Sequence, residues 1–441
     1  MKLPCRVAAM ASLVGACLAG FPAQADENGL WHRESLIGDW GGARSDLSDH
    51  GVDVGLGYVG ETLGDVAGGM KRGWSYEGRA EFALDLDLDK LLGWRGGSAH
   101  GSVFQIHHSD GTPAVNYTGS IGDPSNIEAR QTTRLYTLWL QQEFFADAVS
   151  IRAGQLAADD EFITSETAGN LINGTFGWPA LASANQTNGG PAYPLPTPGV
   201  RVAFAPTDAV TLLAGVFSGD PAGGDCPEDA QLCNKHGTSF SMSGGTLWMG
   251  ELQYAVGQDE SGLSGLYKIG GWYETGTFAD QRRGFGHAHS DDHGFYAVAD
   301  QTVWRDAEAH ALSFFARVGA APSDRNLVSF YADSGFAYTG LLPRRDGDIL
   351  AVGVGYSRIS TDAREADRDV QIMTSDPAYP LRDHETVLEV SYTAPIAPWW
   401  SVQPDVQYIV HPGGNVQNPE DASGGTIDNA VVIGVRTSLV F

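Results

Sequence analysis

The sequence predicts an all-β protein, a transmembrane antiparallel β-barrel of about sixteen strands with a short N-terminal helical segment. Many short segments alternate apolar with polar residues, as strands with one lipid-facing and one wet side do. The chain also ends inside such a segment, and a barrel must pair its last strand with its first to leave no open edge. After the first 25 residues, no segment has the roughly 18 apolar residues of a spanning helix.

Residues 1–25 read as a secretory signal peptide. Lys2 and Arg6 precede an apolar run over 7–21, and Ala23-Gln24-Ala25 follows as a small-residue cleavage site. A short buried helix and a lipoprotein site before Cys17 fit this pattern less well. We therefore expect an exported chain with a periplasmic segment over 26–51 and a barrel over 52–441. Within that segment, residues 43–50 predict a short helix, closed by Gly51, at or inside the periplasmic mouth.

The strands follow from alternation and turn residues. Leu84, Leu86 and Leu88, for example, alternate with Asp85 and Asp87. A soluble β-sandwich or propeller also alternates, but aromatic residues near the strand ends favour a membrane barrel. The first ten connections run long and short in turn. The expected strands are 52–60, 77–89, 98–108, 133–144, 148–156, 200–205, 210–217, 247–256, 266–275, 294–304, 310–320, 327–336, 349–359, 384–394, 400–410 and 430–441.

Two connections carry further information. The segment 157–199, after the fifth strand, is the longest and is rich in Phe, Trp, Leu and Ile, which predicts that it folds inward and narrows the pore rather than facing the exterior. Removal of the leader leaves Cys226 and Cys233 as the only cysteines. In an exported protein such a close pair predicts a disulfide, since His236 alone is too little for a metal site.

The charge excludes one class of partner. Net charge is -27, from 27 Lys and Arg against 54 Asp and Glu, so nucleic acid is not an expected ligand. The acidic excess concentrates in loops. It suits contact with divalent cations that bridge lipopolysaccharide, and equally repulsion of anionic solutes from the entrance.

Several motifs resemble the carbohydrate-selective porins of Gram-negative outer membranes (OprB type). They are Gly38-Asp39-Trp40-Gly41-Gly42-Ala43-Arg44, Gly93-Trp94-Arg95-Gly96-Gly97, Arg152-Ala153-Gly154-Gln155, Asn173-Gly174-Thr175-Phe176-Gly177-Trp178-Pro179 and Pro198-Gly199-Val200-Arg201. The resemblance runs from about residue 36 to 441. It implies a 16-stranded barrel that passes monosaccharides into the periplasm. The terminal Phe441 similarly resembles the signal that barrel-insertion machinery reads.

A sugar path needs fixed hydrogen-bonding groups and an aromatic platform. The resemblance implies arginines at the constriction, and strand parity places several on the wet face, where a structural salt bridge is the alternative role for each. Acids such as Glu251, Glu389 and Asp405 would balance their charge. Trp178 is the candidate platform. The expected constriction residues are Arg79, Glu81, Arg134, Arg152, Trp178, Arg201 and Arg317.

The sequence was also searched for residues that could bind a metal or catalyse a reaction. His287, His289 and His293 lie in a predicted outer loop, where solvated side chains are a simpler interpretation than a metal site. No G-x-S-x-G or H-E-x-x-H motif occurs. We therefore expect a passive sugar channel with no catalysis and no cofactor. A general diffusion porin and a barrel enzyme stay open as alternatives, as does association of three copies.

Overall fold

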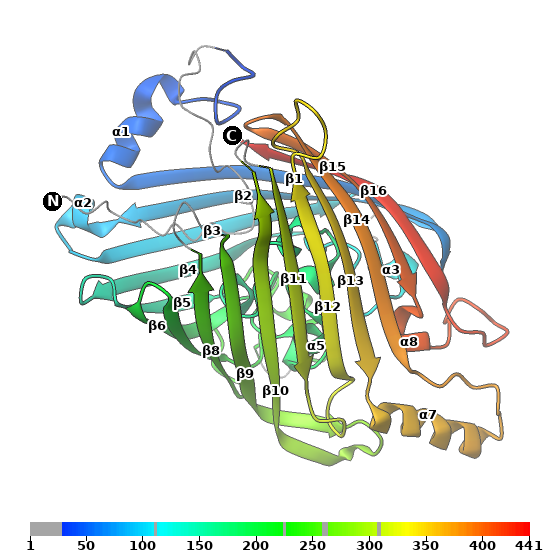
Figure 1. Ribbon diagram of the computed structural model, residues 1–441. Coiled ribbons are helices and arrows are strands. Elements are labelled where there is room, and N and C mark those ends of the chain that lie inside the picture. Colours follow the sequence, from blue (N-terminus) through cyan, green and yellow to red (C-terminus); the bar gives the residue numbers. More distant parts are fainter. Residues whose placement is uncertain (1–28, 110–112, 224–225, 258–262, 307–309) are drawn as a thin grey trace.

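Sixteen antiparallel strands form one closed barrel in sequence order, and β1 pairs with both β2 and β16 (Figure 1). The computed structural model describes residues 29–109, 113–223, 226–257, 263–306 and 310–441. The predicted fold class and strand number are confirmed. The predicted signal peptide lies outside the described residues.

The strands are β1 (Val52–Gly69), β2 (Gly73–Asp87), β3 (Gly97–His108), β4 (Thr132–Phe144), β5 (Val149–Leu156), β6 (Thr197–Thr207), β7 (Val210–Ser218), β8 (Thr246–Val256), β9 (Gly265–Asp280), β10 (Gly284–Arg305), β11 (Ala311–Ala320), β12 (Val328–Thr339), β13 (Ile349–Ile359), β14 (His384–Ala397), β15 (Trp400–Val410) and β16 (Asp428–Val440). The α-helices are α1 (Ala43–Asp49), α2 (Leu88–Leu92), α3 (Val115–Thr118), α4 (Gly174–Gly177), α5 (Ala180–Ser183), α6 (Ala230–Cys233), α7 (Thr361–Thr374) and α8 (Pro412–Asn415). No helix among the described residues is long and apolar enough to cross a membrane.

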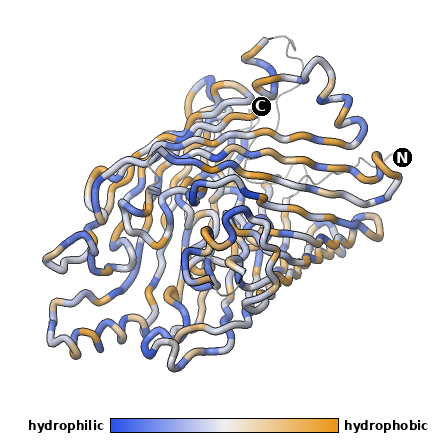
Figure 2. Tube along the Cα trace, turned by 180° about the vertical axis from the view of Figure 1, so that it is seen from behind, coloured by the Kyte–Doolittle hydropathy of each residue, from blue (hydrophilic) through white to orange (hydrophobic). Residues whose placement is uncertain are grey.

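Alternation of exposure confirms which face of each strand points inward. On β6, Val200 and Val202 are 39% and 37% exposed while Arg201 between them is 3% exposed. Figure 2 shows hydrophobic and hydrophilic residues alternating along the strands. A strand has a period of two, so its apolar side faces outward and its polar side lines the lumen.

Two predicted long connections are wrong. Residues 61–76 and 276–293 were expected to be loops, but β1 with β2 and β9 with β10 continue as long hairpins. The turns between these strands are only 70–72 and 281–283. Glycines and polar residues in both stretches resemble a loop. A hairpin that projects beyond the lipid has no apolar face to preserve, so its ladder hydrogen bonds persist without the alternating pattern.

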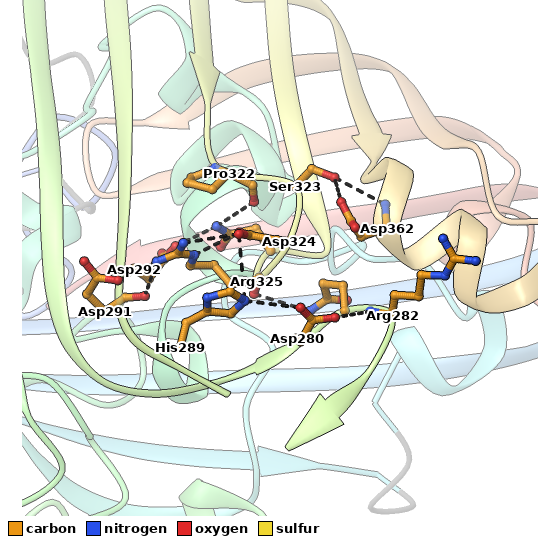
Figure 3. A network of polar contacts seen from close by, with 12 residues as sticks. Asp280, Arg282, His289, Asp291, Asp292, Pro322, Ser323, Asp324, Arg325 and Asp362 are labelled. Carbon is orange, nitrogen blue, oxygen red and sulfur yellow. Dashed lines mark hydrogen bonds and ion pairs between the residues drawn. The ribbon is translucent and has the colours of Figure 1, made fainter. Parts of the chain in front are cut away.

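The hairpin of β9 and β10 places the three histidines on a strand, not in a loop. Figure 3 shows His289 between two carboxylates, at 3.4 Å from Asp280 and 3.8 Å from Asp324. Arg325 pairs with Asp291 and Asp324, which ties the hairpin to the connection between β11 and β12. His287 is exposed, and the His293 ring contacts Phe295. The three histidines therefore do not converge on one point.

The N-terminal segment closes the seam between β1 and β16 at the barrel end where β1 begins and β16 ends. The predicted helix forms as α1, but none of its residues is buried, so it lies at the barrel end and not inside the mouth (Figure 1). Arg44 donates to the carbonyl oxygens of Val54 and Phe441 at 3.1 and 2.7 Å. The backbone N–H of Leu36 donates to Val440 at 2.8 Å. These bonds hold both chain ends at one seam.

Candidate functional site

The connection between β5 and β6 folds into the barrel, as predicted, and Figure 1 shows its helix α5 within the ring of strands. It is fastened to β8–β15, which we call the anchoring wall. The backbone N–H of Asn173 donates to Glu389 at 2.9 Å, and Thr175 donates its hydroxyl to Tyr331 at 3.1 Å. Its apolar side chains, including Phe162, Phe176 and Leu181, are buried. The aromatic content that predicted an inward connection therefore packs against the anchoring wall.

A second connection, between β3 and β4, also folds inward, which the sequence did not indicate. Ile121 and Gly122 donate backbone N–H groups to Glu385 at 2.7 and 3.0 Å. The two inward connections bind one another, since Gly174 donates to the Asp123 carbonyl at 2.8 Å. This stretch contains few large apolar residues, so composition offered no signal of its position.

The inner faces of β2–β6, which we call the arginine wall, lie opposite. Glu161 of the inward connection bridges two arginines of this wall. Its carboxylate lies 2.8 Å from Arg152 Nη1 and 2.6 Å from Arg201 Nε. Arg79 Nη2 lies 3.8 Å from Glu81. Four predicted constriction residues therefore lie on this wall, each beside a group of opposite charge: Arg79, Glu81, Arg152 and Arg201.

Aromatic rings line the same wall. The Arg79 guanidinium lies over the rings of Phe104 and Tyr193, at 4.5 and 5.3 Å from their centroids. Phe104 stacks on Tyr136 with centroids 4.3 Å apart. Arg152 lies 3.9 Å from the Trp139 ring. The positions of Phe104 and Tyr136 were missed because strand aromatics were assigned to the lipid interfaces.

Arg134 has the least predictable orientation of the expected residues. Ser102 of β3 faces both Tyr136 and Thr137 of β4, a β-bulge that changes the strand's parity between Arg134 and Trp139. Arg134 is 1% exposed and donates Nη2 to the Asn234 carbonyl at 3.0 Å. Its Nε and Nη1 find no hydrogen-bond acceptor among the described residues.

Arg317 and Trp178 lie apart from the arginine wall. Arg317 is 2% exposed, pairs with Asp333 and donates to backbone carbonyls of the inward connection. Trp178 is half-buried against the core that includes Leu181, and its indole N–H donates to the Gly189 carbonyl at 3.0 Å. Both side chains thus support the conformation of the inward connection.

The two cysteines lie in a third connection, between β7 and β8. A disulfide joins Cys226 to Cys233, with Cα atoms 6.1 Å apart. Next to it, Asp229 pairs with Arg130 at 2.8 Å, and Asn234 accepts from Arg134. The cross-linked segment is therefore attached to the strand that carries Arg134.

Known porins resemble this chain over most of its length. Porin B of Pseudomonas aeruginosa is 28% identical over 97% of this chain and 96% of its own length. The Putative porin QuiX of Acinetobacter baylyi is 23% identical over 90% and 92%. The high pH structure of Pseudomonas putida OprB has a TM-score of 0.82 at 24% identity, covering 93% of this chain and 99% of that one.

The family match covers most of the sequence. Residues 71–441 match the family described as Carbohydrate-selective porin, OprB family. The family and the fold indicate a channel and not an enzyme. The chain therefore belongs to the OprB family of carbohydrate-selective porins, which places it in the outer membrane of Gram-negative bacteria as a sugar-selective channel.

Proposed function

We propose that this channel passes glucose-like monosaccharides by passive diffusion, without catalysis or a cofactor, and that the arginine wall recognises them. One observation carries the proposal. The Arg79 guanidinium lies against two aromatic rings and 3.8 Å from the Glu81 carboxylate, so donors, an acceptor and ring faces stand together on this wall. A sugar offers hydroxyl groups to such donors and apolar ring faces to such aromatics.

The charge balance of the wall supports a neutral solute. Arg152 and Arg201 share one carboxylate, and Glu81 lies near Arg79. An anion would compete with Glu161 for its arginines, whereas a hydroxyl accepts a hydrogen bond without displacing that carboxylate. Within the proposed constriction set, Arg134 acts by holding the connection between β7 and β8 through Asn234, and Trp178 and Arg317 act by shaping the inward connection.

Sugar flux tests the proposal directly. In liposome swelling with glucose, we expect Arg79→Ala with Arg152→Ala to slow sugar entry and to weaken the block of ion current by glucose. A hydrogen bond to a charged group contributes about 1.5–3 kcal/mol, so each lost contact weakens block by roughly 10-fold or more. The matched control is Arg358→Ala, because Arg358 is exposed and lies away from the lumen.

The alternatives predict different results. Wild-type flux no faster than in protein-free liposomes would overturn the sugar channel. High ion conductance that glucose leaves unblocked would identify a general porin. Loss of a hydrolytic activity on replacing one Ser or His would identify a barrel enzyme.

We also propose three associations outside the pore: insertion of the barrel through the terminal Phe441, contact of the acidic rim with lipopolysaccharide through divalent cations, and assembly of three copies. Phe441 is held by hydrogen bonds to Leu56 and Arg44. Deleting Phe441 should slow membrane insertion, chelation should loosen lipopolysaccharide binding, and the mass of the detergent-extracted protein decides the copy number.

A further inference from the structure

A compact group of three metal-ligating side chains lies at the barrel end opposite Phe441, away from the arginine wall. Asp383 precedes β14, His384 begins it, and His411 directly follows β15. Asp383 Oδ1 lies 3.3 Å from His384 Nδ1 and 3.0 Å from His411 Nδ1. All three ligand atoms lie within 4.8 Å of one another, and no other group of three among the described residues does this.

The backbone holds these residues in place. Asp383 donates its N–H to Gly414 and accepts from the Ile359 N–H, both at 2.9 Å. The N–H of His411 donates to Asn429 Oδ1 at 3.0 Å, and its backbone has a φ of 52°. The His384 ring stacks on Tyr356 with centroids 5.3 Å apart. An ion would therefore meet ligands that are already oriented, which lowers the entropy cost of binding.

The distances suit a small tetrahedral ion. Bonds of about 2.0–2.1 Å in a tetrahedron separate neighbouring ligand atoms by about 3.3–3.4 Å. The two separations from Asp383 are close to this value, so small side-chain rotations would complete the site. Two imidazoles with one carboxylate suit zinc-class ions, whereas Ca²⁺ and Mg²⁺ prefer oxygen ligands.

We propose that Asp383, His384 and His411 bind one divalent transition-metal ion of the zinc class, with a fourth position left for water. The three side chains are each about one-third exposed or less, at 28%, 29% and 34%, so an ion can reach them from the solvent. The bound ion would fasten the connection after β15 to the start of β14. The neighbouring Gly413 N–H donates to the lumen carboxylate Glu385 at 2.8 Å. The ion would therefore lie close to a carboxylate that also holds the connection between β3 and β4.

A titration of the purified full-length protein, stripped of metal by a chelator and kept in detergent, tests the proposal. We expect calorimetry to show one Zn²⁺ per chain, and Co²⁺ to give the visible absorption of a tetrahedral complex. His384→Ala and His411→Asn should each weaken Zn²⁺ binding at least about 10-fold. Asparagine is chosen at 411 because it tolerates the left-handed backbone.

His293→Ala is the matched control, because His293 is a partly exposed histidine of the β9–β10 hairpin. It should bind Zn²⁺ as the wild type does. Resistance of the barrel to unfolding in SDS verifies that each variant is folded. The proposal is overturned if the wild type binds no Zn²⁺, if a folded His384→Ala, His411→Asn double variant binds it equally well, or if equimolar Ca²⁺ displaces it.

Discussion

Replacing Arg317 by methionine tests whether the inward connection depends on one buried guanidinium. Arg317 pairs with Asp333, at 2.5 Å from its Nη2, and donates to four backbone carbonyls of the connection. Those carbonyls belong to Ile163, Thr175, Phe176 and Gly177, at 2.9–3.2 Å. Methionine fills a similar space but makes none of these bonds.

The substitution leaves a buried carboxylate without its cation, which sets the size of the expected destabilisation. Removing one partner of a buried ion pair costs about 3–5 kcal/mol, because Asp333 stays buried without its cation. The four carbonyls also lose a charged donor. If only about 3 kcal/mol of this falls on the connection, its displaced population rises roughly 100-fold. We therefore expect higher single-channel conductance and weaker block by glucose.

A second variant separates the charge from the loop contacts. Arg317→Met with Asp333→Asn removes the unpaired carboxylate, while the amide oxygen can still accept from the Tyr331 hydroxyl, now 2.7 Å from Asp333. We expect urea unfolding in liposomes to show most of the stability restored. Conductance should stay high, because the loop carbonyls remain without donors. Wild-type conductance and glucose block in the single variant would refute the reasoning.

Two further predictions concern other connections. Cys226→Ala with Cys233→Ala opens a loop whose ends are 7 residues apart. We expect the free energy of unfolding in urea to fall by up to about 2–3 kcal/mol, and proteases to cleave this connection more readily. Unchanged cleavage would contradict the prediction. Burial, with the nearby Asp123 and Glu77 charges, raises the pKa of Glu128 well above its usual value. The folded state then holds a proton that the unfolded chain has released, so stability falls as pH rises from the unfolded towards the folded pKa. Glu128→Gln should flatten this slope between pH 5 and 8 in urea titrations, and an unchanged slope would assign it to another group.

Strand parity predicted the inward-facing side chains wherever the alternation was uninterrupted. Val200 and Val202 placed Arg201 in the lumen, and Ile151 placed Arg152 there. An irregularity in a strand interrupts the alternation. One extra residue at 136–137 changes the parity of β4. The residues at this bulge form no pattern from which it could be predicted.

The partners of the arginines were beyond prediction for a different reason. Glu161 reaches Arg152 and Arg201 only because its connection returns through the lumen. That path depends on hydrogen bonds between groups far apart in the chain, such as Asn173 with Glu389. Composition indicated that the connection folds inward, since its aromatic residues need burial, but it did not specify which strands receive it.

The same contacts explain how a chain with a net charge of -27 can have an arginine-rich wall in its lumen. Carboxylates of the anchoring wall accept backbone N–H groups from the inward connections. They are Glu251 from Ile163, Glu274 from Thr187, Asp300 from Thr167, Glu385 from Ile121 and Gly122, and Glu389 from Ile172 and Asn173. A carboxylate that accepts such donors is turned away from the open path and holds the inward connection in place.

The acids of the anchoring wall and the arginines of the arginine wall therefore have different roles in the lumen. The acids of β8–β14 fix the position of the inward connections, and those connections in turn present Glu161 and Tyr193 to the arginine wall. A solute meets arginines whose charge is partly balanced by one shared carboxylate and whose faces are covered by aromatic rings. In the proposed role of the arginine wall, a rigid set of this kind favours hydroxyl groups over free ions, so we expect selectivity for a sugar to depend on the anchoring acids as much as on the arginines themselves.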